Sequence, residues 1–219
     1  MSKRVFVGIL LLVPALNAAA ADDGDWQIWF GGVAAGNLAD SVKAAVEETA
    51  YYSNDDGEVY EQYTQPSLSW TALDWLVLGG GCRFVFSKSA SGWLQEDRPY
   101  LELTLKTDWE GWKVKNRSRV AYRSRETGDD LWRFRNKTTV ALPWTLSAWK
   151  LGFYLAEEFF FEQEQEGIYR NRAYAGLTLG RILGLETLGG DFYFMWDATE
   201  KDWGWQDTYV LGTMAILAF

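Results

Sequence analysis

Hydrophobic and polar residues alternate with a period of two along most of the chain. Four runs show this most clearly: Leu76, Leu78, Gly80, Cys82, Phe84 and Phe86; Leu101, Leu103 and Leu105; Trp149, Leu151, Phe153 and Leu155; and Phe192, Phe194 and Trp196. A period of two is the spacing of side chains on one face of a β-strand. Turn residues divide the chain into eleven such segments, which we predict as strands: 26–36, 41–52, 59–70, 75–87, 98–107, 112–125, 131–142, 148–161, 168–180, 187–197 and 205–219. The pattern predicts an all-β fold.

The last segment is apolar up to its final residue, Phe219. Its alternate positions from Tyr209 to Phe219 again have the spacing of one face of a strand. The eleven residues from Tyr209 to Phe219 are too few for a membrane-spanning helix, which needs about 20. They fit a membrane-spanning strand, which needs about 9–11 residues. We therefore expect this strand to end at a membrane interface, with Phe219 as its anchor.

The first residues have the layout of a secretory signal. Lys3 and Arg4 precede an apolar core that ends at Leu16, and small residues follow up to Ala21. We expect residues 1–21 to be a cleaved signal peptide and residues 22–219 to form one domain, since about 200 residues suit a single domain. A membrane-anchoring helix is disfavoured because the apolar core is short.

Charge and aromatic content then narrow the class. Without the signal, 19 basic and 30 acidic residues remain, a net charge near −11 that argues against nucleic acid as a partner. The single Cys82 cannot form an internal disulfide and is expected to be buried and inert. An exported chain with 13 Trp, 11 Tyr and 12 Phe, and without apolar helical spans, is typical of a bacterial outer-membrane β-barrel.

Two kinds of connection alternate between the segments, which suggests short periplasmic turns and longer acidic outer loops. "TALD", "DWEG", "PWTLS" and "RILGL" are short, whereas "SNDDGE", "SKSASGWLQED", "RETGDD", "EQEQEG" and "ATEKDWGWQD" are mostly longer and acidic. Indole rings that flank the short turns suit a membrane-interface girdle, which would also include the terminal aromatic ring. Its members are Trp70, Trp75, Trp109, Trp112, Trp144, Trp149 and Phe219.

The predicted segments conflict with the usual strand number of bacterial barrels. The sequence contains eleven segments, which is an odd number, whereas bacterial barrels have even numbers of strands. Either segment 26–36 is not a full strand, which gives ten, or a twelfth strand is hidden. Pro66 is a second irregularity and predicts a bulge, because proline removes a ladder hydrogen bond. The prediction is an antiparallel transmembrane β-barrel of 10–12 strands.

On each strand, alternate positions are apolar and should face lipid. The positions between them should face the lumen, and they are rich in basic residues. The predicted lumenal basic cluster comprises Lys113, Lys115, Arg117, Arg119, Arg123, Arg133, Arg135, Lys137, Arg170 and Arg172, joined by Arg83, Lys106 and Lys150. The predicted lumenal acids are Glu47, Glu61, Glu102, Glu158, Asp191 and Asp197, of which Glu102, Glu158 and Asp191 are the expected partners. Other acids, including Glu58, Glu96 and Glu162, are assigned to solvated loops.

Two interpretations of this lumen remain open. Arg–Glu ladders fill the interior of small barrels, and long arginine side chains can plug it. Alternatively, the surplus of cations lowers the barrier for small anions, as charged side chains do in pores. Asn116, Ser118, Asn136 and Thr138 do not fit the parity, since they are polar at lipid-facing positions. They would lie near a rim, or a bulge would shift the register there.

Residue types argue against an enzyme. The chain contains no His, which excludes Ser–His and Asp–His catalytic arrangements. One Cys and no His leave only carboxylates as metal ligands, so we expect neither a metal nor a cofactor. Glu157 and Glu158 are neighbours on a strand and should point to opposite faces. The glycines at 79–81 lie within a strand and more plausibly relieve crowding than bind phosphate.

Four short stretches carry a resemblance to a known family: "VKNRSRVAYR" (114–123), "RFRNKTTVALP" (133–143), "AEEFFFE" (156–162) and "YRNRAYAGL" (169–177). With them the chain, from Trp26 to Phe219, resembles the uncharacterised outer-membrane barrel family catalogued as domain of unknown function 2490. The resemblance implies an outer-membrane β-barrel but no activity. The positions that look like the family's polar core are Asn116, Arg117, Arg119, Arg123, Glu158, Arg170, Asn171 and Arg172.

The leading functional hypothesis is a narrow outer-membrane channel that favours small anions. The alternative is a closed structural or surface-interaction barrel without transport activity. A soluble periplasmic barrel or sandwich is disfavoured by the tryptophans at the turns and by the terminal Phe219. Expected partners are outer-membrane lipid, lipopolysaccharide and small anions. A terminal aromatic residue also resembles the signal read by the barrel assembly machinery.

Overall fold

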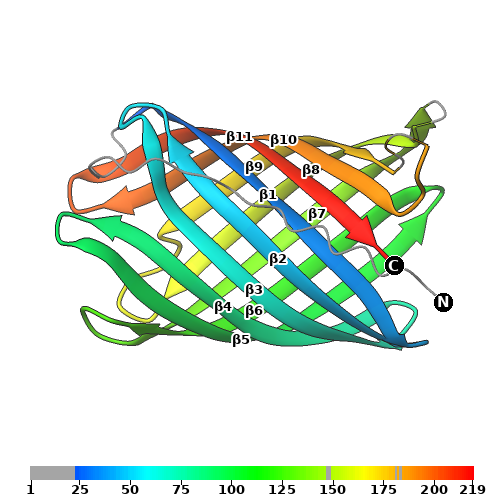
Figure 1. Ribbon diagram of the computed structural model, residues 1–219, viewed down its shortest axis with the longest axis horizontal. Helices are drawn as coiled ribbons and strands as arrows, with labels where there is room; N and C mark the ends of the chain where they lie inside the picture. The colour runs from blue at the N-terminus through cyan, green and yellow to red at the C-terminus, as the bar shows by residue number, and fades with distance from the viewer. Residues whose placement is uncertain (1–22, 147–148, 181, 183) are drawn as a thin grey trace, which may run out of the picture.

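The computed structural model of the protein describes residues 23–146, 149–180, 182 and 184–219. In this part of the chain, eleven strands close into one barrel (Figure 1). They are β1 (Asp25–Ala39), β2 (Val42–Ser53), β3 (Glu58–Leu73), β4 (Leu76–Ser89), β5 (Gly92–Trp109), β6 (Trp112–Arg125), β7 (Leu131–Leu146), β8 (Leu151–Glu162), β9 (Arg170–Leu179), β10 (Leu188–Lys201) and β11 (Gly204–Ala218). The all-β barrel is confirmed, and the expected signal peptide lies outside the described residues.

The barrel closes through a parallel pair, which corrects the expectation of ten or twelve strands. Consecutive strands pair antiparallel, and β1 pairs β11 in parallel from Asp25↔Thr208 to Ala35↔Ala218. With an odd number of alternating strands, the first and the last run in the same direction, so only a parallel pair can join them. Segment 26–36 is therefore a full barrel strand, and no twelfth strand is needed.

The barrel has two ends, which we call the turn end and the loop end. The turn end carries the β1–β2, β3–β4, β5–β6, β7–β8 and β9–β10 connections and the last residue of β11, and the loop end carries the others and the start of β1 (Figure 1). The expected contrast in length is only partly correct. At the loop end, Ala90–Ser91 and Asp202–Trp203 are tight two-residue links, because the strands extend into the stretches taken as loops. At the turn end, the β9–β10 connection covers residues 180–187 and is not short.

The ladder of the described residues has register shifts around Leu38, Tyr60, Ala72 and Pro143. Pro66 interrupts the β3–β4 pairing between Thr64↔Phe84 and Ser67↔Gly81 without a register shift, so the predicted bulge is absent there. β3 is instead bulged at Tyr60, opposite Tyr51 and Tyr52 of β2, and its pairing with β4 shifts at Ala72. A further shift occurs in the β7–β8 pair around Pro143, where proline cannot donate to the ladder.

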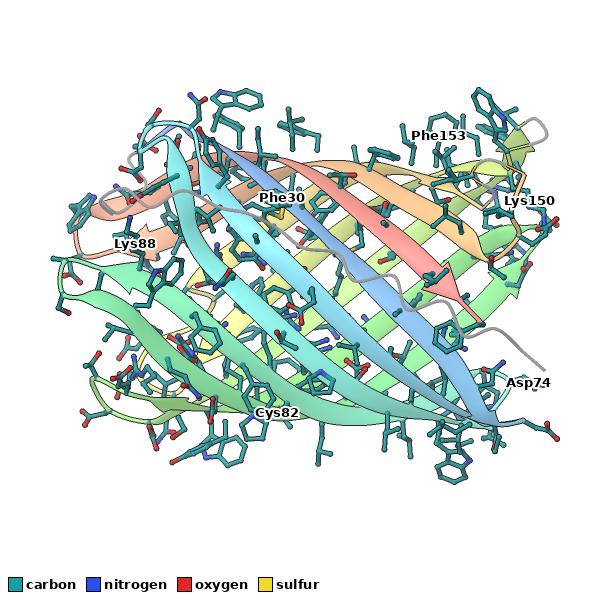
Figure 2. All side chains as sticks on the ribbon, in the orientation of Figure 1. Phe30, Asp74, Cys82, Lys88, Lys150 and Phe153 are labelled. Carbon is teal, nitrogen blue, oxygen red and sulfur yellow. The ribbon has the colours of Figure 1, made fainter. Side chains whose placement is uncertain are left out.

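Burial alternates along the strands as the period of two predicts. On β5, Leu101, Leu103 and Leu105 are exposed on the outer face, whereas Tyr100 and Thr104 between them are buried in the bore. Cys82 follows the apolar outer parity of β4 but is only half-buried. Figure 2 shows outer side chains such as Phe153 projecting away from the barrel, with Lys150 at the turn end and Lys88 at the loop end.

Glycines facing the bore make room for large rings on neighbouring strands. A Cβ on Gly212 would lie 2.0 Å from the ring of Tyr193, and one on Gly176 would lie 2.3 Å from the ring of Tyr154. A Cβ on Gly81 would lie 2.9 Å from the hydroxyl of Tyr100 and closer still to a backbone carbonyl. The three glycines at 79–81 thus relieve crowding, as the sequence predicted.

Candidate functional site

The candidate site is the charged interior of the barrel. Nearly all of the expected basic side chains have inward parity on their strands, and Arg119 and Arg172 are buried. Lys150 does not belong to them, since it lies in the β7–β8 connection at the turn end, where its ammonium donates to Glu186 over 2.7 Å. The prediction of a lumenal Lys150 was wrong because β8 begins at Leu151, after this residue.

Glu158 is the centre of the interior cluster. Its carboxylate is buried on β8, with 3% of the side chain exposed, and lies 3.5 Å from Arg117 and 3.6 Å from Arg135. The hydroxyl of Tyr174 donates to it over 2.8 Å, and the ammonium of Lys137 lies 3.4 Å from the centre of the Tyr174 ring. Burial of a carboxylate is tolerated only when charges and donors surround it, and these four side chains supply them.

Asp197 forms a second centre, on the β9–β10 wall. Its carboxylate accepts hydrogen bonds from Arg170 at 2.7 Å and from Arg172 at 3.0 Å. The guanidinium of Arg172 also lies 4.8 Å from the ring centre of Trp29, on β1. Asp191, expected as a partner of arginine, instead accepts a hydrogen bond from the hydroxyl of Tyr154 at 3.0 Å. It follows the inward parity of β10 but forms no ion pair within the described residues.

Three glutamates that sequence reasoning placed in loops lie inside the bore near the loop end: Glu58, Glu96 and Glu162. Glu58 is buried at the start of β3 and forms an ion pair with Lys88 of β4. Glu96 binds Arg123 through two hydrogen bonds of 2.5 and 2.7 Å and also accepts from Arg98. Glu162 accepts from Arg123 at 2.5 Å and from Arg133 at 2.6 Å. The signal was present in the sequence, since Glu96 and Arg98 share the parity of Glu102. The prediction missed it because that strand was started at residue 98, while β5 begins at Gly92.

A small cavity lies among these arginines. Its volume is about 30 Å³, which is room for about two water molecules. Tyr100 and Ala121 line it together with six arginines: Arg83, Arg98, Arg119, Arg123, Arg133 and Arg135. Among the described residues, Arg83 donates to Gln65 over 2.8 Å, and four carboxylates form ion pairs with the other five guanidinium groups: Glu96, Glu102, Glu158 and Glu162. The cavity, which we call the arginine chamber, therefore has a surplus of positive charge.

Several contacts inside the bore join strands that are not neighbours. Arg119 of β6, which pairs with Glu102 of the adjacent β5 over 2.6 Å, also donates to the side-chain oxygen of Gln65 on β3, three strands away, over 3.0 Å. Arg172 of β9 reaches Trp29 of β1. A core cluster of buried side chains fills the space between these contacts: Trp29, Tyr51, Tyr63, Val85, Ala156, Tyr174, Met195 and Val210. Side chains from strands three apart in the barrel order thus meet inside the barrel.

The turn end of the bore differs from the rest. Lys113 and Lys115 have the expected inward parity but are exposed, and no carboxylate of the described residues lies within 4 Å of their ammonium groups. Lys106 on the neighbouring strand is exposed as well and pairs with Lys115 in register. The predicted basic cluster is therefore divided into a buried, ion-paired part and an exposed part.

Two rings of tryptophan surround the outer face. The expected ring lies at the turn end, where Trp70, Trp75, Trp109, Trp144 and Trp149 are exposed and Trp112 is half-buried. Phe219 belongs to the same end, where it is 77% exposed and its N–H donates to Ala35. A second ring, which sequence reasoning did not identify, lies at the loop end and consists of Trp26, Trp93, Trp132, Trp203 and Trp205.

Between the two rings the outer face carries a polar cluster, which we call the outer polar patch: Asn116, Ser118, Asn136, Thr138, Glu157 and Asn171. Asn116 pairs with Thr138 and Ser118 with Asn136, and the β6–β7 register runs without a shift. Neither a bulge nor a rim position explains these residues, so both alternatives from the sequence are wrong. As expected, Glu157 and Glu158 point to opposite faces, since Glu157 is exposed outside while Glu158 is buried inside.

The β6–β7 connection at the loop end has its own polar order. Asp130 accepts a hydrogen bond of 2.9 Å from the backbone N–H of Arg125 and another of 2.9 Å from the hydroxyl of Tyr122. These two donors hold the pKa of Asp130 below its usual value. The loop is therefore stapled by an ionised carboxylate.

The described residues contain no group of three or more acidic or Cys side chains placed to hold a metal ion. They also contain no helix long and apolar enough to cross a membrane.

Comparison with known proteins identifies the family but no activity. The chain matches no curated protein. The sequence profile of the family described as "Protein of unknown function (DUF2490)" matches residues 26–196, from β1 into β10. Because this match covers more than half of the chain, the protein belongs to the uncharacterised family DUF2490.

Proposed function

We propose that the protein is an integral β-barrel of the bacterial outer membrane whose bore is closed by side chains and which acts through its outer surface and loops. The two tryptophan rings support the membrane placement. On β7, Trp132 and Trp144 are twelve residues apart. This separation is about 40 Å along the strand and about 30 Å along the axis at a tilt of roughly 40°. An apolar band of about 25 Å between aromatic girdles is usual for such barrels.

The observation that carries the closed bore is the set of contacts inside it between strands that are not neighbours. The Arg119–Gln65 hydrogen bond of 3.0 Å joins β6 to β3, and the Arg172–Trp29 contact joins β9 to β1. The arginine chamber leaves about 30 Å³, which is too little for a solute larger than water or a small ion. The proposal includes no catalytic role.

Partners follow from this placement. Lipid and lipopolysaccharide would surround the apolar belt, and the acidic loop end would face outward. The barrel assembly machinery would read the last strand, where Phe219 is exposed beside the seam of β1 and β11. The N-terminal signal expected from the sequence would direct export.

Planar-bilayer recording of the purified barrel under a salt gradient tests the closed bore. We expect no steady conductance from the natural protein. The Arg119→Ala/Arg172→Ala variant, which removes both contacts between non-neighbouring strands, should conduct. Lys150→Ala is the matched control, since it removes one cation outside the bore and should stay silent. Steady conductance of the unaltered barrel would overturn the closed state.

A second candidate, a narrow path for small anions, is favoured by one observation: six arginines surround a chamber to which four carboxylates are paired. The same recording separates the two functions. If the natural barrel conducts with an anion-selective reversal potential, and Arg133→Ala/Arg135→Ala weakens that selectivity, the lumen is a pathway. If only the variant lacking the contacts between non-neighbouring strands conducts, the arginines act as a plug.

A further inference from the structure

The outer polar patch is the feature that the closed barrel does not explain. On β7, Thr138 lies six residues from Trp132 and six from Trp144, which is the middle of the belt between the two rings. On β6, Ser118 lies six residues from Trp112. If the rings mark the two membrane interfaces, the patch faces the centre of the hydrocarbon region. Polar side chains placed there are costly and mark functional surfaces by default.

The patch is half satisfied by its own hydrogen bonds. The side-chain amide of Asn116 donates to Asn136 and to Thr138, both over 2.9 Å. The amide of Asn136 donates in return to Asn116 over 3.0 Å and to Ser118 over 2.8 Å. These bonds use all the amide hydrogens of the two asparagines. The hydroxyl groups of Ser118 and Thr138 accept in this network, and their hydrogens remain to donate outward.

The other half of the patch has acceptors without matching donors. Glu157 is exposed on β8, and among the described residues its side chain accepts one long hydrogen bond, of 3.4 Å, from Asn171 of β9. A carboxylate can accept about four hydrogen bonds. Donors on the β6–β7 side and the carboxylate on β8 are complementary. Thr138 lies opposite Glu157 in register, whereas Ser118 lies two strands away from β8, so the donors of one copy cannot all reach the carboxylate of that copy.

A two-fold axis through this wall would bring the two halves together. Copies of one protein in a membrane share their orientation, so a two-fold axis between them runs along the membrane normal and relates the same surface on both. With the axis at the β7–β8 pair, strands β6 and β7 of one copy face β9 and β8 of the other. The donors of each copy then meet Glu157 of its partner on both sides of the axis.

We propose that, in the membrane placement proposed above, the outer polar patch is the interface of a homodimer, with a second copy of this chain as its occupant. Hydrogen bonds between polar side chains hold membrane segments together where lipid offers no alternative partner. An apolar hollow beside the patch supports contact there. Its floor is the small Ala175 of β9, and it lies between Leu155 of β8 and Phe194 of β10. Outward side chains of the other copy can enter it.

An outward carboxylate on the opposite wall defines the competing arrangement. Glu48 of β2 is exposed, pairs with Thr64 in register, and lies on the wall opposite to the β7–β8 pair. A head-to-tail array would join the patch of one copy to Glu48 of the next. In the proposed dimer, by contrast, Glu48 faces lipid and takes no part.

Single-cysteine cross-linking in native membranes tests the dimer. In a Cys82→Ser background, Thr138→Cys places a thiol beside the proposed axis, and Val46→Cys places one at an exposed outward position of β2 on the opposite wall. Oxidation with copper–phenanthroline should give a covalent dimer of the Thr138→Cys protein and leave the Val46→Cys protein monomeric. A monomer in both cases overturns the dimer. Cross-links that form only when the two variants are mixed overturn it in favour of the head-to-tail array.

A second variant separates the interface from the fold. Asn116→Leu/Asn136→Leu/Glu157→Leu removes the polar groups on the outer face only, and it should weaken dimerisation in detergent by at least about tenfold. The barrel should keep its heat-modifiable mobility on gels, because no bore contact changes. A dimer of unchanged mass overturns the proposal. If the natural protein is released from membranes by a carbonate wash, the membrane placement itself fails, whereas a membrane-bound monomer contradicts the dimer alone.

Discussion

Strands β6, β7 and β8 carry two polar clusters, one on each face of the same wall. Inside, Arg117, Arg119 and Arg135 surround Glu158 and other carboxylates. Outside, the neighbouring positions hold the uncharged Asn116 and Asn136, joined by paired amide bonds. Inside the bore, strands up to three apart come within contact and most of the arginines find a carboxylate partner, while the outer face offers only immediate neighbours. Charge is therefore concentrated where the fold can neutralise it.

Glu158 and its neighbour Glu157 give the sharpest test of this contrast. Glu158→Leu should destabilise the barrel by about 3–5 kcal/mol, because Arg117, Arg135 and Lys137 would lose the carboxylate that they share. Glu157→Leu, one residue away on the outer face, should cost little or nothing. The measurement is urea-induced unfolding of each variant in detergent micelles. Equal losses for the two leucine variants would contradict the contrast between the faces.

Substitutions of two glycines near the β1–β11 seam compare how tightly the inner and the outer face of the wall are packed. Gly212→Ala should destabilise by about 1–3 kcal/mol, since the added Cβ would lie 2.0 Å from the ring of Tyr193 in the filled bore. Gly32→Ala adds the same group on the outer face, where the nearest atom lies 3.6 Å away, and should be neutral. Thermal unfolding followed by gel mobility measures both. A neutral Gly212→Ala would mean that the interior is loosely packed.

The outer amides should matter for association and not for folding. Asn116→Leu/Asn136→Leu should leave the free energy of unfolding of the monomeric barrel within about 0.5 kcal/mol of its original value, the usual range for surface changes. The matched inner change, Arg117→Leu/Arg135→Leu, should reduce stability clearly because it strips Glu158 of its cations. Unfolding of both variants in a detergent that keeps the protein monomeric would decide. A large loss from the asparagine pair would assign it to the fold.

The smallest effect is expected at the loop end. The pKa of Asp130 is lowered by the donors Arg125 and Tyr122, so the loop staple is complete above the pKa of an unfolded aspartate and is lost as pH falls through the folded value. The protection of the Arg125 backbone N–H, which is the intrinsic exchange rate divided by the observed rate at each pH, should fall in that acid range, and Asp130→Asn should remove this fall. Protection that stays constant over the acid range would disprove the hydrogen bonds of Asp130.

The period of two was enough to predict the strands, because each face of a barrel wall repeats it. All eleven segments found in the sequence are strands, with ends that differ by a few residues. Ion pairs were harder to predict, since Arg119 and Gln65 are brought together only by the curvature of the closed barrel. Glu96 was assigned to a loop because the strand was predicted to begin at residue 98, whereas β5 begins at Gly92. The expectation of ten or twelve strands was wrong because the general rule of even strand numbers was preferred to the eleven segments counted in the sequence.

The parallel seam has a consequence for assembly. Each other strand pair joins neighbours in sequence, so ten of the pairings can form as local hairpins, whereas β1 and β11 come from the two ends of the described chain. The entropy of bringing distant segments together is lost before the new ladder compensates for it, and parallel ladders are slightly weaker per residue. We therefore expect the seam to form last and to open first. The barrel would then exist either as an unsealed curved sheet or as a complete cylinder, and one pairing decides between them.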